Sequence, residues 1–234
     1  MSVTALVFDV FGTVVDWRSS VARQVAAAAR PIGVETDGFA LADAWRAQYA
    51  PAMDRVRRGE LPWTTIDVLH RAALDALLPR FGLDALDEAA RQALNRAWHR
   101  LDPWPDSVAG LRRLRHRHML ATLSNGNVAL LANMAKHARL PWDVILSAEL
   151  FGHYKPDAEV YDGACRLLDL EPAQVMMVAA HNGDLRAAAA RGLRTAFVAR
   201  PTEYGPAQTK DLAADGAWDV VCTSFTDLAG ALGC

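Results

Sequence analysis

The stretch ALVFDVFGTVVDWR, residues 5–18, places an acid directly after a short apolar run. Residues 5–8 are branched or aromatic apart from one alanine, which is typical of a buried strand of a parallel sheet. Asp9 follows at once, and a Gly-Thr turn comes soon after it. A carboxylate at the end of a buried strand costs free energy unless it has a partner or a function. Asp9 is therefore the first candidate functional residue of the chain.

The same kind of strand returns in the second half of the chain. Apolar runs predict strands at 119–123, 144–146, 175–178, 195–198 and 220–222, with helices at 108–116, 157–168 and 184–191 between them. Strands that alternate with helices in this way form parallel βαβ units. The sequence therefore predicts an α/β fold whose core is three-layered and Rossmann-like, with a parallel sheet.

Residues 17–99 interrupt this alternation. They show no strand pattern, but apolar residues recur at helical spacing. Two examples of a shared helix face are Trp45, Gln48, Tyr49 and Ala52, and Leu86, Ala90, Leu94 and Trp98. The segment DPWPD, residues 102–106, is a strong helix breaker. We therefore predict an α/β core domain made of residues 1–16 and 100–234, with a helical cap domain, residues 17–99, inserted into it.

Composition excludes several classes of protein. The chain has 234 residues, of which 52% are hydrophobic and 22% charged, and its net charge is −2. No basic patch predicts a nucleic-acid partner, and no apolar run reaches the length of a membrane span. No secretion signal is recognisable. Three widely separated cysteines, Cys165, Cys222 and Cys234, argue against a disulfide framework or a zinc site and favour a cytoplasmic location.

Ligands of open parallel sheets bind beyond the carboxyl ends of the strands. The residues predicted there are Asp9, 124–126 and 179–184. The cap is inserted just after the first strand, so it would cover this edge of the sheet.

Four motifs at these strand ends, in order along the chain, resemble those of the haloacid dehalogenase superfamily. They are Phe8-Asp9-Val10-Phe11-Gly12-Thr13, Leu123-Ser124-Asn125-Gly126, Tyr154-Lys155-Pro156-Asp157, and Asp184 followed by Ala187-Ala188. The resemblance covers nearly the whole core and has a helical cap in the usual place.

Two positions depart from the Mg²⁺-dependent phosphatases of that superfamily. Phe11 stands where they carry a general acid, and Ala180 where they carry a metal-binding acid. Mg²⁺ requires oxygen ligands, and phosphoryl transfer requires charge neutralisation, so neither change suits that chemistry. A departing halide needs neither a proton nor a metal. The chain therefore resembles the (S)-2-haloacid dehalogenase (type II) branch, whose cap signature is similar to Trp45-Arg46-Ala47-Gln48.

The resemblance implies catalytic roles for five residues. Asp9 would be the nucleophile that forms an ester with the substrate, and Thr13 would orient it. Lys155 would keep Asp9 ionised. Asp184 would pair with Lys155 or orient the hydrolytic water, although it would also suit a helix cap. His181 departs from the branch, which has Asn there; it would assist ester hydrolysis or shape the halide pocket, unless it is only structural.

Six further residues are predicted to bind substrate or halide. Ser124 and Asn125, with Gly126, precede a helix and would hold the substrate carboxylate through exposed amides, or serve as ordinary helix caps. Arg46 would accept the halide, unless it is one more solvated arginine of the cap. Tyr161 and Phe11 match aromatic positions of the family. Trp17 either walls the pocket or packs at the joint between core and cap.

The predicted function is the metal-independent hydrolysis of short 2-haloalkanoic acids, haloacetate or (S)-2-haloacids, to 2-hydroxyacids. The partners implied are the haloacid and a halide ion, no cofactor is expected, and the family resemblance implies a homodimer. Alternatives are a Mg²⁺-dependent phosphatase or mutase, a non-catalytic binding protein, and displacement of another leaving group such as a strained ring amine. The sequence leaves the preferred halogen open.

Overall fold

The computed structural model describes residues 2–234, so Met1, the first residue of the predicted core, lies outside it. The main sheet of the described chain has six strands in the order β5-β4-β1-β6-β7-β8, and all neighbours are parallel. In chain order the strands are β1 (Ala5–Phe8), β4 (Met119–Ser124), β5 (Val144–Ser147), β6 (Val175–Ala179), β7 (Arg194–Val198) and β8 (Val220–Cys222). Each strand predicted from the sequence overlaps one of these, and the predicted α/β class is confirmed.

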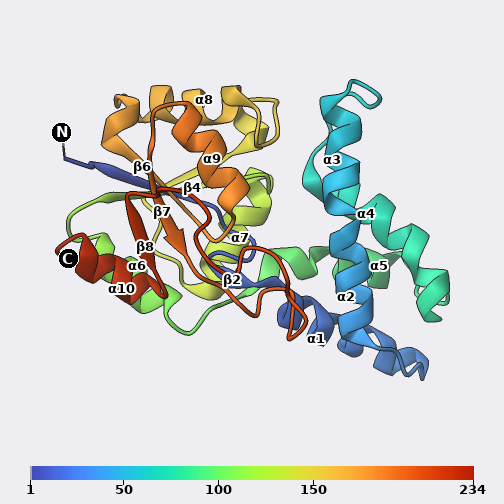
Figure 1. Cartoon of the computed structure of the whole chain (residues 1–234). Coiled ribbons are helices and arrows are strands. Elements are labelled where there is room, and N and C mark those ends of the chain that lie inside the picture. Colours follow the sequence, from blue (N-terminus) through green and yellow to red (C-terminus); the bar gives the residue numbers. More distant parts are fainter. Residues whose placement is uncertain (1) are drawn as a thin grey trace.

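Helices cover both faces of the sheet, which gives three layers (Figure 1). Successive residues of a strand point to opposite faces. Accordingly, Leu6 and Phe8 of β1 join one apolar cluster and Val7 joins the other. The first cluster includes residues of α6 (Ser107–Leu114), α7 (Val128–Ala138) and α10 (Phe225–Ala231), and the second includes residues of α8 (Ala158–Leu168) and α9 (Asn182–Ala190). β1 is thus buried on both faces, and its carboxyl end is held in the middle of the sheet.

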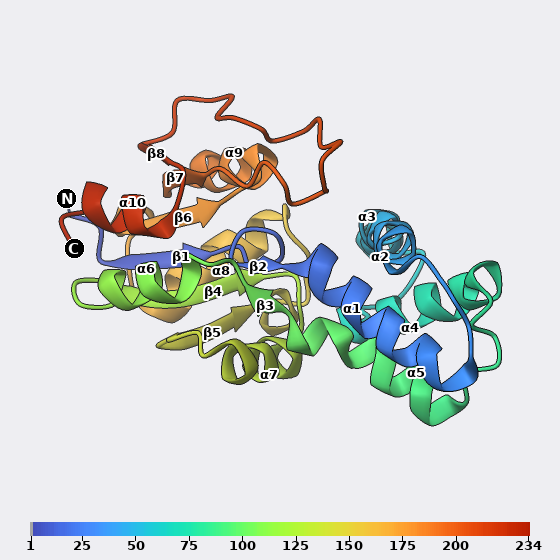
Figure 2. The same ribbon diagram turned by 90° about the horizontal axis from the view of Figure 1, so that it is seen from below.

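The helices of residues 17–99 lie together beside the sheet, as Figures 1 and 2 show. They are α1 (Trp17–Ala29), α2 (Gly38–Ala47), α3 (Tyr49–Arg57), α4 (Ile66–Leu77) and α5 (Glu88–Asn95), with short 3-10 turns η1 (Arg30–Ile32), η2 (Leu78–Phe81) and η3 (Arg96–Arg100). Two more 3-10 turns, η4 (Ala148–Leu150) and η5 (Pro172–Gln174), connect core elements. We call residues 17–99 the cap; its bounds as a separate domain remain a proposal.

A short ribbon joins the two places where the chain passes between core and cap. β2 (Val15–Asp16) pairs with β3 (Asp102–Pro103) in antiparallel fashion, with Val15 opposite Pro103. The side chain of Trp104, just after β3, donates a hydrogen bond of 2.8 Å to the carbonyl of Gly12. The sequence predicted only a helix breaker here, because a strand of two residues that contains proline carries no readable pattern.

The two predicted helix faces were wrong in their extent. α2 ends at Ala47 and α3 begins at Tyr49, so Trp45 and Tyr49 belong to different helices. Pro51 explains the break, since it has no N–H to donate to the carbonyl of Ala47. Likewise α5 contains only Ala90 and Leu94 of the second predicted face. Leu86 precedes the helix, whose start is capped by Asp87 accepting a bond from the N–H of Ala90, and Trp98 lies in the following turn η3.

Two global features bear on the predicted surroundings of the protein. Among residues 2–234, no helix is long and apolar enough to cross a membrane. The three cysteines are free, with Cys165 and Cys222 buried. The cytoplasmic location inferred from cysteine usage stays a prediction.

Candidate active site

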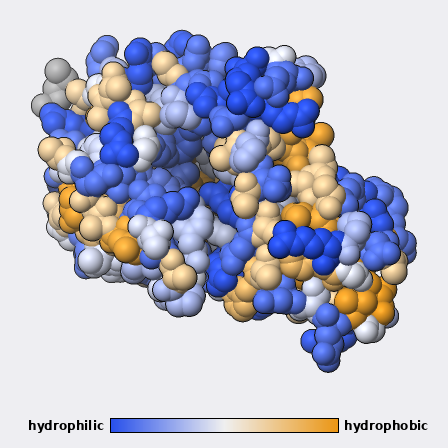
Figure 3. All heavy atoms as spheres, turned by 45° about the vertical axis from the view of Figure 1, so that its right-hand side comes forward, coloured by the Kyte–Doolittle hydropathy of each residue, from blue (hydrophilic) through white to orange (hydrophobic). Residues whose placement is uncertain are grey.

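A cavity of about 320 Å³ lies at the carboxyl end of β1, between core and cap. Figure 3 shows the molecule hollowed between its two parts, with hydrophilic side chains bordering the hollow. This volume is at the small end of the range for ligand pockets, so it suits a small molecule. The cavity is lined by Asp9, Phe11, Arg46, Tyr49, Asn125, Lys155, Pro156, Tyr161, His181, Gly183 and Asp184. Eight of the predicted site residues are among them, although they come from six separate segments of the chain.

Asp9 has a partner for each carboxylate oxygen. Its Oδ1 accepts a bond of 3.0 Å from Lys155 Nζ, and its Oδ2 accepts one of 2.7 Å from the hydroxyl of Thr13. His181 Nδ1 also lies 3.0 Å from Oδ2. Thr13 is fully buried beneath Asp9, and its own hydroxyl accepts a bond of 2.9 Å from the N–H of Ala180. The predicted contacts of Thr13 and Lys155 with Asp9 are therefore present, while the catalytic roles of these residues stay predictions.

Lys155 bridges Asp9 and a second acid, Asp184. Its ammonium group contacts a carboxylate oxygen of Asp184, and the other oxygen of Asp184 accepts a bond of 2.6 Å from the hydroxyl of Tyr161. This confirms the predicted Lys155–Asp184 pair. Asp184 lies in the first turn of α9, where a negative charge is favoured by the helix dipole. The main chain of Lys155 is itself fixed by Asn125, whose Oδ1 accepts its N–H at 2.7 Å.

The charges around Asp9 decide its ionisation. Burial by itself would raise the pKa of the Asp9 carboxyl, but the positive charge of Lys155 and the contacts with His181 and Thr13 outweigh burial and hold this pKa well below its ordinary value. Burial would lower the pKa of Lys155, yet Asp184 and Asp9 raise it. Asp9 is therefore an anion and Lys155 a cation at neutral pH, which is the state that a carboxylate nucleophile requires.

Arg46 and Tyr49 form the wall of the cavity on the cap side. The guanidinium of Arg46 lies 4.2 Å from the centre of the Tyr49 ring, and its Nη1 is buried with no hydrogen-bond partner in the described chain. A second cavity, of about 430 Å³, is bordered by the same two residues together with Trp17, Tyr204 and Lys210. An unpaired guanidinium N–H beside the cavity is suited to an anion.

The amides after β4 are only partly available to a substrate carboxylate. The Ser124 hydroxyl accepts a bond of 3.2 Å from the N–H of Gly126, and the N–H of Val128 at the start of α7 donates to Glu149 at 2.8 Å. Ser124 is buried and is not among the residues that line the cavity, whereas Asn125 is. The structure thus brings Asn125 to the site but keeps the Ser124 side chain behind it.

Phe11 fills the position of the missing acid with an apolar wall. Its ring makes edge contacts with Tyr49 and Trp98, with ring centres 6.2 Å and 5.8 Å apart. Among the described residues, no group of three or more His, Cys, Asp or Glu side chains is arranged to hold a metal ion. Metal independence nevertheless stays a prediction that a chelator must test.

Trp17 lies behind the site rather than beside Asp9. It is fully buried, lines the second cavity, and its Nε1 donates a bond of 3.0 Å to Glu203. Glu203 is a residue that the sequence reasoning missed. It belongs to the segment after β7, and the fact that β7 ends at the same edge of the sheet was the one signal that could have drawn attention to it.

The fold and the site together define a class of hydrolase, in which a carboxylate at the end of a central parallel strand faces a cavity roofed by a helical insertion. The model of haloacid dehalogenase-like hydrolases matches residues 3–192. The chain therefore belongs to the haloacid dehalogenase-like hydrolase family.

Individual proteins of that family are similar to the chain over nearly its whole length. The chain is 31% identical over 216 residues to (S)-2-haloacid dehalogenase 1 of Pseudomonas sp. strain CBS-3, which covers 86% of this chain and 88% of that protein. It is 56% identical to an L-2-haloacid dehalogenase of known crystal structure, with a TM-score of 0.96 and 99% of each chain covered. A defluorinating L-2-haloacid dehalogenase is 49% identical, with a TM-score of 0.97, over 99% of this chain and 96% of that one.

Proposed function

We propose that the protein hydrolyses short 2-haloalkanoic acids to 2-hydroxyacids and releases halide. The observation that carries this proposal is the ionised Asp9, paired with Lys155, facing a small cavity in which Phe11 occupies the place of an acid. The relatives at 31% to 56% identity, all named 2-haloacid dehalogenases, support it. Partners of the protein would then be the haloacid and the halide ion.

In the first step, an oxygen of Asp9 attacks the carbon that bears the halogen. A carbon–oxygen bond forms, the carbon–halogen bond breaks with its electron pair going to the halide, and an ester of Asp9 results. In-line attack places the leaving halide opposite Asp9, towards the cap, where Arg46 is the cation that lines the cavity. Asn125 would hold the substrate carboxylate from the core side.

In the second step, water attacks the carbonyl carbon of the ester. The tetrahedral intermediate expels the 2-hydroxyacid and restores the Asp9 carboxylate, so oxygen from water enters Asp9 first. We propose that Lys155 stabilises the negative charge of the intermediate and that Asp184, held by Tyr161, fixes Lys155 for this purpose. His181 is the candidate base for the attacking water.

Three finer points extend this proposal. The defluorinating neighbour supports fluoroacetate as a substrate to be tested. A dimer formed through the cap is proposed from the family resemblance alone. Light scattering of the purified protein tests it, and a mass near that of one chain would contradict it. A cytoplasmic location is proposed from the cysteines alone.

A halide-release panel tests the proposed function. Fluoro-, chloro- and bromoacetate and both enantiomers of 2-chloropropionate are incubated with the protein, with and without a chelator. We expect release from at least one haloacetate and from the S enantiomer of chloropropionate, and no effect of the chelator. Phosphatase activity that rises with Mg²⁺, in the absence of any halide release, would contradict the proposal.

Replacing Arg46 tests the proposed halide acceptor. We expect Arg46→Ala to lower kcat/KM by roughly 100-fold or more, because the leaving anion loses its buried cation, and Arg46→Lys to lie between it and the natural protein, because an ammonium lacks the guanidinium fork. Steady-state halide release measures both. Arg30→Ala, at an exposed arginine of the cap, is the control. Halide release at the normal rate from Arg46→Ala would remove Arg46 from the mechanism.

A further inference from the structure

Glu203 is a buried acid beside the candidate active site, and it does not line the cavity. Only 1% of its surface is exposed. One carboxylate oxygen accepts the Trp17 Nε1–H at 3.0 Å, and the other lies 2.9 Å from His181 Nε2. A buried carboxylate with both oxygens engaged by side chains is costly to maintain unless its contacts serve a purpose.

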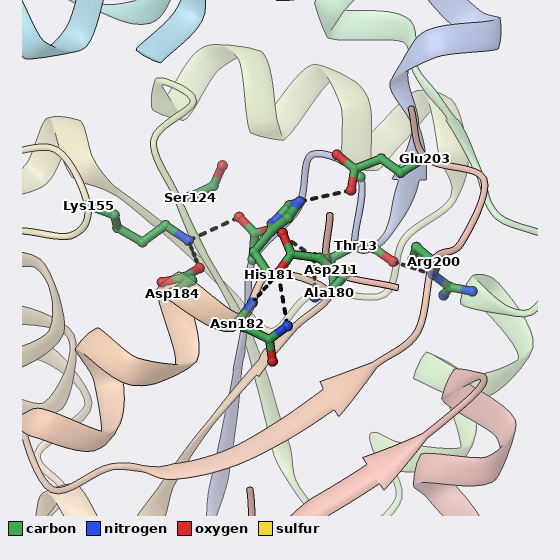
Figure 4. A network of polar contacts seen from close by, with 12 residues as sticks. Thr13, Ser124, Lys155, Ala180, His181, Asn182, Asp184, Arg200, Glu203 and Asp211 are labelled. Atoms are coloured by element: carbon green, nitrogen blue, oxygen red, sulfur yellow. Dashed lines mark hydrogen bonds and ion pairs between the residues drawn. The ribbon is translucent and has the colours of Figure 1, made fainter. Parts of the chain in front are cut away.

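The fold is built to hold Glu203 in this place. Arg200, at the start of its loop, donates 2.9 Å to the carbonyl of Thr13 and binds Asp106 through two bonds of 2.8 and 2.9 Å. Further along the loop, Asp211 accepts bonds of 3.0 Å from the main chain and side chain of Asn182 (Figure 4). The loop is thus tied to the core on both sides of Glu203.

Gly12 leaves the space that the carboxylate occupies. A Cβ atom at this position would lie 2.1 Å from a carboxylate oxygen of Glu203, and the residue has a φ of +82°. Both features favour glycine at position 12, three residues after Asp9, the candidate nucleophile. The turn after β1 and the loop after β7 are therefore fitted to each other around Glu203.

His181 connects Glu203 to Asp9. It stands at the N-cap of α9, yet its side chain makes no capping bond and instead spans the two acids, with Nδ1 3.0 Å from Asp9 and Nε2 2.9 Å from Glu203. Burial by itself would lower the pKa of His181, but the two carboxylates raise it well above its ordinary value. Other titratable groups that border the same space are Arg46, Tyr49, Lys155, Tyr161 and Asp184.

We propose that Glu203 is a positioning residue that fixes His181 against Asp9, so that His181 becomes the general base only after Asp9 has been converted to the ester. This inference rests on the proposed function. In the resting protein both ring nitrogens carry protons, because each faces a carboxylate. Esterification removes the charge of Asp9, so His181 Nδ1 loses the acceptor that held its proton. Glu203 still accepts the proton on His181 Nε2, and this bond keeps the ring in its orientation.

The protons balance over the two steps. When the ester forms and halide leaves, Nδ1 releases its proton to water. When water attacks the ester carbonyl, the free Nδ1 takes a proton from it. That proton passes to the departing 2-hydroxyacid oxygen as its bond to the carbonyl carbon breaks. The second proton of the attacking water, now on the regenerated Asp9 carboxyl, returns to Nδ1 and restores the resting state. The net products are 2-hydroxyacid, halide and one proton.

Glu203→Gln tests the proposal by separating the two half-reactions. Under single turnover with the best haloacid of the panel, we expect a halide burst at nearly the natural rate, followed by an Asp9 ester that persists roughly 100-fold longer or more, since a general base contributes about 10²–10⁴-fold. Rapid quench and intact-protein mass follow the ester. Glu203→Asp, which restores the charge on a shorter side chain, should recover part of the rate. Glu171→Gln, at an exposed glutamate, is the matched control.

A second measurement does not depend on turnover. ¹⁵N resonances of His181 report its protonation, and we expect its pKa to fall in Glu203→Gln but to stay raised in Glu171→Gln. Three results in Glu203→Gln would each overturn the proposal. They are ester hydrolysis at the natural rate, a slowed halide burst with unchanged ester hydrolysis, and an unchanged pKa of His181. If the natural protein forms no ester from any haloacid, the proposed function fails. The ¹⁵N titration of His181 then still decides whether Glu203 raises the pKa of His181.

Discussion

Asp9→Asn is expected to abolish halide release. The amide keeps the size of the carboxylate but has no nucleophilic oxygen anion, and removal of a nucleophile from a hydrolase costs on the order of 10⁶-fold in kcat. The cavity, Lys155 and Thr13 would all remain, so binding alone cannot rescue the reaction. Halide release by the purified variant, measured over hours, gives the residual rate, and mass spectrometry excludes conversion of the new asparagine back to aspartate.

An isotope experiment on the natural protein complements this variant. In heavy-oxygen water under single turnover, the label should enter the Asp9 peptide first, because water attacks the ester carbonyl rather than the substrate carbon. The control for the Asp9→Asn variant is Asp169→Asn. Asp169 is exposed, and its backbone has the left-handed conformation, which asparagine also tolerates. Label that enters only the product would exclude the ester and, with it, Asp9 as nucleophile.

Lys155→Met is expected to lose both activity and stability. Lys155 is buried and contacts both Asp9 and Asp184, so its removal leaves two adjacent carboxylates without their cation. Breaking a buried ion pair from one side costs about 3–5 kcal/mol of unfolding free energy. Halide release should fall by roughly 100-fold or more, because Asp9 loses the cation beside its Oδ1 and the ester intermediate loses its stabilising charge. Denaturant unfolding and steady-state kinetics measure the two losses.

The pH dependence of this stability loss has a definite sign. In the natural protein the pKa of Asp9 lies below its unfolded value of 3.8, so its contribution is fully present above that pH and is lost only in stronger acid. Asp184 behaves in the opposite way, because burial already raises its pKa in the natural protein and Lys155 opposes that rise. In Lys155→Met this opposition is lost, so the pKa of Asp184 rises further and stability falls as pH rises through it. The variant should therefore be closer to the natural protein at about pH 5 than at about pH 8.

A double variant tests whether the buried carboxylates cause the loss of stability in Lys155→Met. Lys155→Met combined with Asp184→Asn removes one of the two stranded carboxylates, so we expect part of the lost stability to return while activity stays low. If the double variant regains no stability relative to Lys155→Met, then the buried charges are not the cause of the loss. If Lys155→Met keeps full halide release, Lys155 has no part in the chemistry.

The sequence was informative wherever a short pattern met a general rule. The apolar residues 5–8 predicted a buried strand, and the rule that ligands bind beyond the carboxyl ends of parallel strands brought Asp9 and Asp184 into one region. The family resemblance added Lys155 to them. The structure confirms their contacts. Physically, this worked because the parallel sheet is built from local patterns, while its topology alone determines which loops meet.

Elements without a local pattern could not be predicted. Glu203 lies in an irregular segment after β7, and only tertiary bonds such as that between Arg200 and Asp106 place it beside His181. The break between α2 and α3 was missed for a related reason, because the apolar spacing around Trp45 and Tyr49 continues through it and only Pro51 marks the interruption.

The ribbon of β2 and β3 has a consequence for how the protein can vary. Both chain crossings are bonded to each other, so the cap is one continuous insertion whose two ends meet the core at the same place. Arg46 and Tyr49 line the cavity from this insertion, whereas Asp9, Lys155 and Asp184 belong to the core and contact one another there. Substitutions in the cap could therefore alter which acids are accepted without rebuilding the reactive group, so selection could act on substrate range and on chemistry separately.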